Sequence, residues 1–356
     1  MAERNGKTRP FTAVNYSAAK LAREKQRREY EQQKKEKLIF ALFVVIILVM
    51  ILFAILIFRK VLGNDEPVLM DNDTEIGTQA PEETQGDTEK TVSGAYNEVM
   101  IEKSDLYAGH LLLIDDSHPY RANAALDLTD IYGSRTKFDK PEHKNGFVYS
   151  YYTAGSEGKL ESEALAALNA MADAFYQQTG NNDLYIHTPS SAYNSAATDE
   201  HATGRAFDLS VYTASGVRYQ LDDPAISSDF NWVKENYYKY GFIRRYPEHK
   251  AAITGVANEP YHFLYVGTAH AYYMYEHDLC LEEYLELLRT KHTFKNGGED
   301  NLVFTTDSGE RYEVYFVSAD GDMINLPVPT SFEACSYSGD NANGFVVTVK
   351  YGALYE

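Results

Sequence analysis

Apolar side chains recur at helical spacing in three segments of the chain. The segments span residues 161–178, 228–240 and 281–289, and each places its large apolar residues on one side of a helix. Gly180 follows the first segment and Gly241 ends the second, and glycine is the residue that most often closes a helix. The pattern therefore predicts three amphipathic helices.

Other apolar runs have the length and alternation of β-strands. They are residues 110–120 (a strand and a turn), 183–188, 206–212, 261–266, 302–317 (a hairpin about Ser308 and Gly309) and 344–351. Helices and strands are mixed without the regular alternation of a doubly wound sheet, so the predicted fold class is α+β. Residues 291–356 are predicted to form a small β-rich appendage.

A further apolar run, residues 38–58, contains 21 residues and no charge. As a helix it would span about 30 Å, the thickness of the hydrocarbon core of a bilayer. A signal-peptide core is the alternative, but such cores are shorter and end at a small-residue cleavage site, which this run lacks. We therefore predict a transmembrane helix, with the lipid bilayer as one partner.

The distribution of charge predicts the orientation of that helix. Residues 1–37 hold 11 Lys and Arg, whereas the whole chain has a net charge of −19. By the positive-inside rule the basic segment stays in the cytoplasm, which makes the chain a single-pass type II cell-membrane protein with an extracytoplasmic domain. The acidic exported part excludes nucleic acid as a partner, because phosphate binding requires a basic surface.

Residues 59–98 are rich in Asp, Glu, Thr, Gln and Pro and poor in large apolar residues. Such a composition buries too little apolar surface to fold, so an acidic linker is predicted. The predicted order is a cytoplasmic basic segment (1–37), a transmembrane helix (38–58), this linker (59–98), a globular domain (99–290) and the β-rich appendage (291–356).

The chain has two cysteines, Cys280 and Cys335, both in the part predicted to be exported. Whether they form a disulfide is left open by the sequence. Two thiols so far apart do not make a zinc site of the CxxC type, so a metal site here would use histidine and carboxylate ligands.

Candidate metal ligands occur in two segments. In the first, Asp208 lies on the opposite face of a predicted strand from Phe207, and Gly204 permits a bend that lets His201 fold back towards Asp208. In the second, His262 lies on one face of a predicted strand. Glu259 is expected just before that strand, where a bend aims it past His262.

Together the two segments supply two imidazoles, one carboxylate ligand and one further carboxylate. Zinc peptidases need this set, because three protein ligands leave a tetrahedral position for water and a separate carboxylate takes a proton. Taken singly, a histidine beside an aromatic residue or an aspartate on a strand face is more often structural. The two segments therefore indicate a metal site only when they are taken together.

The order HxTGxAxD (His201 to Asp208) and then ExxH (Glu259 to His262) resembles the VanY-type zinc D-alanyl-D-alanine carboxypeptidases. The likeness extends through residues 236–247 and 253–255 and covers roughly residues 100–290. The resemblance implies that His201, Asp208 and His262 bind Zn²⁺ and that Glu259 is the catalytic base. It also implies a small antiparallel sheet flanked by helices, as in the hedgehog and D,D-peptidase type of fold, and peptidoglycan stem peptides as the substrate.

One departure from the family pattern concerns substrate binding. The family's Ser-Gly-Tyr-Arg-Ser element corresponds here to Ser191-Ala192-Tyr193-Asn194-Ser195, so Asn194 stands at the arginine position. An uncharged amide does not supply the bidentate, charge-assisted grip of a guanidinium on a carboxylate. The candidate substrate-binding residues are Tyr193, Asn194, Ser195 and Arg245. The sequence leaves open whether Arg244 or Arg245 supplies the replacement cation.

The sequence thus predicts a membrane-anchored zinc metallopeptidase that removes the terminal D-Ala from peptidoglycan peptides, a D,D-carboxypeptidase. Three alternatives are an endopeptidase of the cell wall, an L,D-carboxypeptidase of the same fold, and a catalytically impaired wall-binding module. The scissile bond, the oligomeric state and the role of residues 291–356 are left open.

Overall fold

The computed structural model describes residues 96–121, 126–187 and 196–352. The predicted transmembrane helix 38–58 and the basic segment 1–37 lie outside these residues, as does nearly all of the predicted linker. Within the described residues, no helix is both long and apolar enough to cross a bilayer. The linker prediction is wrong at its C-terminal end, because residues 96–98 already belong to strand β1 (Tyr96–Glu102).

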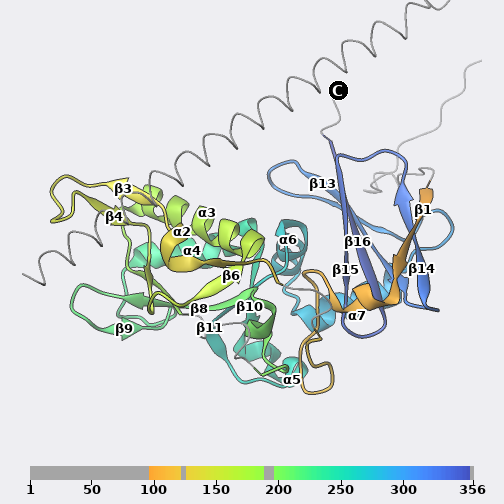
Figure 1. Cartoon of the computed structure of the whole chain (residues 1–356), viewed down its shortest axis with the longest axis horizontal. Helices are drawn as coiled ribbons and strands as arrows, with labels where there is room; N and C mark the ends of the chain where they lie inside the picture. The colour runs from red at the N-terminus through yellow and green to blue at the C-terminus, as the bar shows by residue number, and fades with distance from the viewer. Residues whose placement is uncertain (1–95, 122–125, 188–195, 353–356) are drawn as a thin grey trace, which may run out of the picture. The chain divides into compact units, whose positions relative to one another are not determined.

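The described residues form a mixed fold of helices and small sheets, with one six-stranded sheet at the candidate metal site (Figure 1). Its strands run in the order β10-β11-β8-β7-β5, and β9 pairs with β8. Their bounds are β5 Tyr152–Thr153, β7 Leu184–His187, β8 Ala206–Tyr212, β9 Arg218–Tyr219, β10 Phe242–Tyr246 and β11 Glu259–Tyr265. The predicted antiparallel sheet is therefore found with one exception, because β5 and β7 are parallel.

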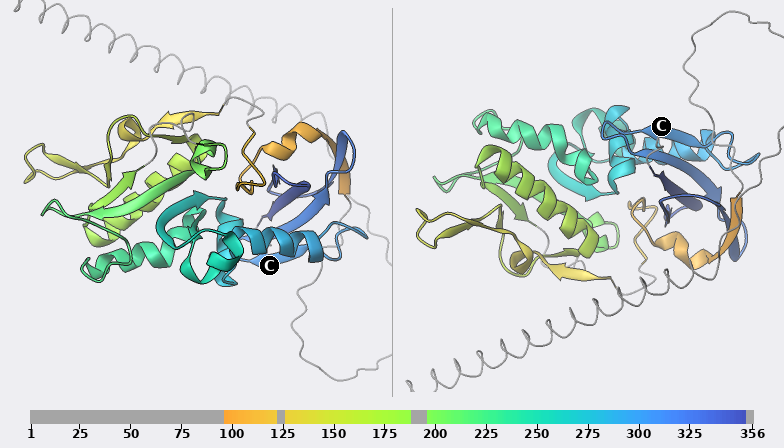
Figure 2. Two further views of the ribbon diagram at one scale, coloured as in Figure 1. Left: turned by 90° about the horizontal axis from the view of Figure 1, so that it is seen from below. Right: turned by 90° about the horizontal axis from the view of Figure 1, so that it is seen from above.

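Both faces of this sheet are covered by apolar side chains. On one face, Phe207 of β8 packs in a cluster with Phe175 of helix α3 (Ser162–Thr179), and Figures 1 and 2 show α3 lying along the sheet. On the other face, Ala206 and Leu264 pack with helices α6 (Thr268–Glu276) and α7 (Leu281–Lys291). The second face is therefore the one that α6 and α7 cover.

Two of the three predicted helices are confirmed. They are α3, which ends at the left-handed Gly180, and α7. The prediction of one helix over 228–240 is wrong, because that segment is divided into η4 (Ser228–Phe230), α4 (Asn231–Asn236) and η5 (Tyr237–Tyr240). Tertiary contacts account for the break: in η5 the Tyr238 ring stacks on Tyr275 of α6 at a centroid distance of 3.7 Å.

The C-terminal strands form their own antiparallel sheet in the order β12-β13-β16-β15, which we call the C-terminal sheet. Their bounds are β12 Leu302–Thr305, β13 Arg311–Ser318, β15 Ala334–Gly339 and β16 Gly344–Tyr351. The predicted hairpin and the predicted strand 344–351 are both confirmed. Strand β14 (Met323–Pro329) instead pairs with β1, so residues assigned from sequence to the globular domain join the C-terminal strands.

Shorter elements connect these parts. They are η1 Lys103–Tyr107, β2 Leu128–Asp130, α2 Ile131–Ser134, β3 Lys137–Asp139, β4 Phe147–Tyr149, β6 Lys159–Glu161, η3 Glu200–Thr203, η6 Glu248–Lys250 and α5 Ala251–Thr254. Strand β2 pairs with β6 and β3 with β4.

The strand predicted in residues 110–120 is not formed. Its apolar residues are buried, but their backbone groups bind a neighbouring loop and side chains: Leu111 N–H donates to Ser338 Oγ, and Leu113 N–H donates to the Asp340 carbonyl. The apolar run predicted burial correctly and the conformation incorrectly. Cys280 and Cys335 are free thiols in the structure.

Candidate metal centre

Strands β8 and β11 bring Asp208 and His262 together. The two residues are direct partners in the antiparallel register, and the next pair, Phe207 and Phe263, stacks in the core with a ring-centroid distance of 5.7 Å. Because side chains alternate along a strand, the pair Asp208 and His262 lies on the opposite face of the sheet from these phenylalanines. His262 Nδ1 is 3.2 Å from Asp208 Oδ1.

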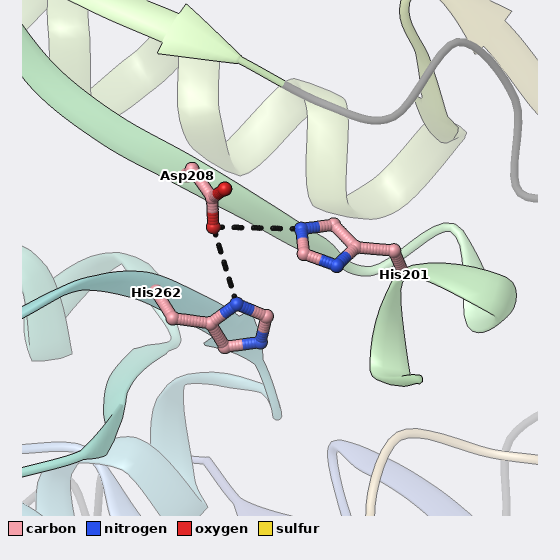
Figure 3. Close-up of side chains that lie close together, drawn as sticks. All are labelled: His201, Asp208 and His262. Atoms are coloured by element: carbon pink, nitrogen blue, oxygen red, sulfur yellow. Dashed lines mark hydrogen bonds and ion pairs between the residues drawn. The ribbon is translucent and has the colours of Figure 1, made fainter. Parts of the chain in front are cut away.

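His201 reaches the same carboxylate from the turn before β8. It lies in η3, which ends at Gly204 in the left-handed conformation (φ 71°), and Gly204 N–H donates to the His201 carbonyl. This bend places His201 Nε2 3.5 Å from Asp208 Oδ1. Figure 3 shows His201 and His262 both directed at the Asp208 carboxylate. The predicted fold-back of His201 is therefore present.

Gly204 cannot be replaced without strain. A Cβ at this position would lie 2.6 Å from Leu128 Cδ2, and an L-residue in the left-handed region costs about 1–2 kcal/mol. We expect Gly204→Ala to lower the free energy of unfolding by more than this amount, measured by urea denaturation. Gly255→Ala is the matched control, because Gly255 has φ +70° and no atom within 4 Å of its Cβ position. Equal losses in the two variants would show that the Leu128 contact is unimportant.

The three side chains together have the arrangement of a metal site. Ligand atoms of His201, Asp208 and His262 all lie within 4.8 Å of one another. His201 Nε2 is buried and has no hydrogen-bond partner among the described residues. A buried lone pair directed at a neighbouring carboxylate and imidazole fits a divalent cation with nitrogen and oxygen ligands, and three such ligands leave a tetrahedral position open.

Each imidazole is held at its other nitrogen by a carboxylate. His201 Nδ1 is 2.8 Å from Asp199 Oδ1, and His262 Nε2 is 3.3 Å from Glu200 Oε2. Metal-binding histidines usually have such a partner, which sets the tautomer and the orientation of the ring. The sequence analysis did not assign these two carboxylates, although their position directly before His201 is a usable indication.

A second group of possible ligands is less suitable. His110, Glu161 and Glu163 also have atoms within 4.8 Å of one another. However, the Arg205 guanidinium is 3.8 Å from Glu161, and both glutamates lie at the N-terminus of α3, where the helix dipole disfavours a cation. The His201, Asp208 and His262 group is therefore the candidate metal centre.

Burial and hydrogen bonding shift the pKa values of these groups. Burial lowers the pKa of His262, but its hydrogen bonds to Asp208 and Glu200 outweigh this effect and raise the pKa to about 9. Burial raises the pKa of Asp208, but its close contacts with His201 and His262 outweigh this effect and bring the pKa well below the usual range. Without a metal, the site therefore holds an ionised Asp208 and a protonated His262 near neutral pH.

Zinc and protons consequently compete for His262. Since its pKa in the folded protein lies above the ordinary 6.5, protonation stabilises the metal-free fold below pH 6.5, and this stabilisation is lost as the pH rises towards 9. Zinc affinity is expected to rise over the same interval. At pH 7.5, binding should release about one proton from His262. Calorimetry in buffers of different ionisation enthalpy measures this number, and zero release would contradict the pKa shift.

Glu259 belongs to β11 and does not precede it, so its predicted position off the strand is wrong. The register nevertheless changes here: Arg244 pairs with Phe263 and Tyr246 with Glu259, so three residues of β11 face Arg245 alone. Such a bulge breaks strict alternation and redirects side chains. Tyr261 indicates the result: burial raises the pKa of its phenol, and so do the charges of both Glu259 and Asp208. The two carboxylates are therefore both close to this phenol.

The predicted substrate-binding residues have different outcomes. Tyr193, Asn194 and Ser195 lie outside the described residues. Arg245 is described, and its predicted role in holding substrate is wrong, because its side chain is 1% exposed and bound by Glu200 and Glu282. Its place in β10, beside the bulge of β11, directs the guanidinium into the protein. The neighbouring Arg244 pairs with Asp222.

His187, which belongs to neither candidate segment of the sequence, also lies beside the candidate centre. It is the register partner of Asp208 across β7 and β8, and its Nδ1 is 3.8 Å from Asp208 Oδ2. Only the strand pairing brings it there, so no local motif could have identified it.

Comparison with known proteins agrees with this geometry. Residues 173–268, which include all three candidate ligands and Glu259, match the family model VanY, described as D-alanyl-D-alanine carboxypeptidase. This part of the chain is therefore similar to the VanY-type family. A D-alanyl-D-alanine carboxypeptidase of Enterococcus faecium is 28% identical over 283 residues, which cover 77% of this chain and 84% of that protein.

A second sequence relative and a solved structure are also similar to this chain. A D-alanyl-D-alanine carboxypeptidase of Enterococcus faecalis is 35% identical over 135 residues, covering 38% of this chain and 45% of that protein. The solved structure of the vancomycin resistance D,D-dipeptidase VanXYg aligns with a TM-score of 0.55 at 22% identity. That alignment covers 72% of this chain and 100% of the other, and it establishes a shared fold.

Proposed function

We propose that this protein is a zinc-dependent D,D-carboxypeptidase that removes the terminal D-Ala from peptidoglycan stem peptides. The observation that carries the proposal is the convergence of His201, Asp208 and His262, whose ligand atoms lie within 4.8 Å of one another. The relatives named D-alanyl-D-alanine carboxypeptidase support the choice of substrate class.

Each residue of the centre has a distinct task in this proposal. His201 Nε2, Asp208 and His262 Nδ1 would hold zinc. In each imidazole the other nitrogen is already bound to a carboxylate. Bound zinc supplies a Lewis acid that polarises the scissile carbonyl and makes water acidic. Glu259 accepts the proton of the attacking water and returns it to the leaving amine of D-alanine. Asp199 and Glu200 keep the two imidazoles in the orientation that ligation needs.

Substrate recognition is assigned to Tyr193, Asn194 and Ser195, on the basis of their place in the family pattern. Asn194 offers one amide in place of a guanidinium fork, so it binds a terminal carboxylate more weakly than arginine would. This departure is the reason to retain the sequence-based alternatives, the endopeptidase, the L,D-carboxypeptidase and the wall-binding module.

We further propose that the enzyme is held at the cell membrane as a type II protein. The apolar run 38–58, the basic residues before it and the acidic residues after it support this topology. In this arrangement residues 59–95 hold the zinc peptidase domain and its β-rich appendage above the outer surface of the bilayer. Protease added to intact protoplasts should digest the domain and spare residues 1–37.

The function is tested by incubating zinc-loaded protein with purified muropeptides and weighing the products. Loss of one terminal D-alanine from a pentapeptide stem, abolished by a chelator, is the expected result. Cleavage of a cross-link would indicate an endopeptidase, and shortening of a tetrapeptide stem would indicate an L,D-carboxypeptidase. Stoichiometric zinc without any cleavage would favour the wall-binding module.

A further inference from the structure

A buried chain of charged side chains connects His262 to helix α7. His262 Nε2 is 3.3 Å from Glu200 Oε2, and Arg245 Nε donates to the other oxygen of that carboxylate at 2.6 Å. The two terminal nitrogens of Arg245 donate to Glu282 at 2.9 Å and 2.6 Å. The side chains of Glu200 and Arg245 are each 1% exposed and that of Glu282 is 19% exposed, so the chain runs through the interior.

The alternation of positive and negative side chains explains why these charged groups are stable in the interior. An isolated buried ion is costly, but here every carboxylate faces a guanidinium or an imidazole, and Arg245 uses three of its donors. If Glu282 were neutral, Glu200 would be the one anionic partner left to Arg245. The guanidinium would then shift towards Glu200 or take in water. Glu200 would then lose the fixed geometry with which it holds His262.

We propose that Glu282 is a positioning residue for the metal centre. It holds Arg245, Arg245 holds Glu200, and Glu200 fixes the tautomer and orientation of His262 so that Nδ1 faces Asp208. The inference rests on the proposed zinc function. It goes beyond that function because Glu282 lies outside residues 173–268, the part that matches the family model.

The location of Glu282 gives the C-terminal sheet a role at the metal centre. Glu282 is in the first turn of α7, and Arg289, in the last turn of the same helix, donates to Asp340 from Nε at 3.1 Å and from Nη2 at 2.9 Å. Asp340 follows β15, and its other carboxylate oxygen accepts from the N–H groups of Ala342, Asn343 and Gly344. The C-terminal sheet thereby holds the helix that carries Glu282.

The test is the zinc affinity of Glu282→Gln, measured by competition with a chromophoric chelator. Removing such an outer partner typically weakens metal binding about 10–100-fold, and we expect the lower end of this range for Glu282 and the upper end for Glu200→Gln. Glu286→Gln is the matched control, because Glu286 is in the same helix, is 64% exposed and lies 4.0 Å from Arg289. It should bind zinc as the wild type does.

A double-mutant cycle separates positioning from general weakening of the fold. If Glu282 acts through Glu200, the double variant Glu200→Gln/Glu282→Gln should bind zinc about as weakly as Glu200→Gln alone. The visible absorption bands of the cobalt-substituted protein should also shift in Glu282→Gln and stay unchanged in Glu286→Gln. Unaltered zinc affinity in a folded Glu282→Gln, or full additivity in the cycle, would overturn the inference.

These outcomes are distinct from failure of the proposed function. A wild-type protein that binds zinc and cleaves no muropeptide would refute the carboxypeptidase proposal and leave the positioning role of Glu282 standing. A wild-type protein that binds no zinc would refute both.

Discussion

Glu259→Gln is expected to lower the rate of D-alanine release by about 10²–10⁴-fold while zinc remains bound, because removal of a general acid–base residue costs a factor of this size. Glutamine has nearly the shape of glutamate but accepts no proton. The bulge in β11 and the charges of Glu259 and Asp208, which with burial raise the pKa of Tyr261, support this role for the side chain. The measurement is kcat on a D-Ala-D-Ala-ended peptide together with zinc content.

Glu248→Gln serves as the control for this variant, because Glu248 is an exposed glutamate in η6, shortly after β10. It should retain the wild-type rate. If Glu259→Gln kept full activity with zinc bound, Glu259 would not be the base, and another group would have to be sought near Tyr261. If the variant lost zinc as well, its effect would be on the metal centre rather than on proton transfer.

His262→Ala is expected to abolish both zinc binding and activity. The substitution removes one of three protein ligands, and two protein ligands are fewer than catalytic zinc sites use. It also leaves Glu200 with Arg245 as its remaining partner in the interior. Elemental analysis of the purified protein should find well below one zinc per chain.

The matching control is His249→Ala, since His249 is 58% exposed and its ring contacts Asp278. This variant should retain one zinc per chain and the wild-type rate. Retention of stoichiometric zinc by His262→Ala would refute the ligand assignment directly, whatever the activity. A circular dichroism spectrum like that of the wild type would show that loss of zinc is not caused by unfolding.

Local patterns predicted much of the fold. Helices α3 and α7, the C-terminal hairpin and β16 all agree with the spacing of apolar residues, because an amphipathic segment buries its apolar face in only one regular conformation. The errors occur where distant contacts override local preference. Residues 228–240 are divided by stacking on α6, and Leu111 N–H binds the side chain of Ser338 in β15 instead of joining a strand ladder.

The same division applies to the metal centre. His201, Asp208 and His262 were identified from two short motifs, and the structure brings them within 4.8 Å. Their surroundings were not predictable. Arg245 was assigned to the substrate from its charge, whereas the structure buries it between Glu200 and Glu282. His187 reaches Asp208 only through the pairing of β7 with β8.

By itself the sequence determined which atoms are available for chemistry, because imidazole and carboxylate groups at motif spacing are properties of the chain. It also determined the apolar segment and the charge asymmetry on which the proposed topology rests. Only the tertiary structure decided which nitrogen of each imidazole faces Asp208, where Arg245 points, and that α7 is linked to the metal centre through Arg245 and Glu200. These features depend on strand register and on a bulge, which arise from pairing between segments far apart along the chain.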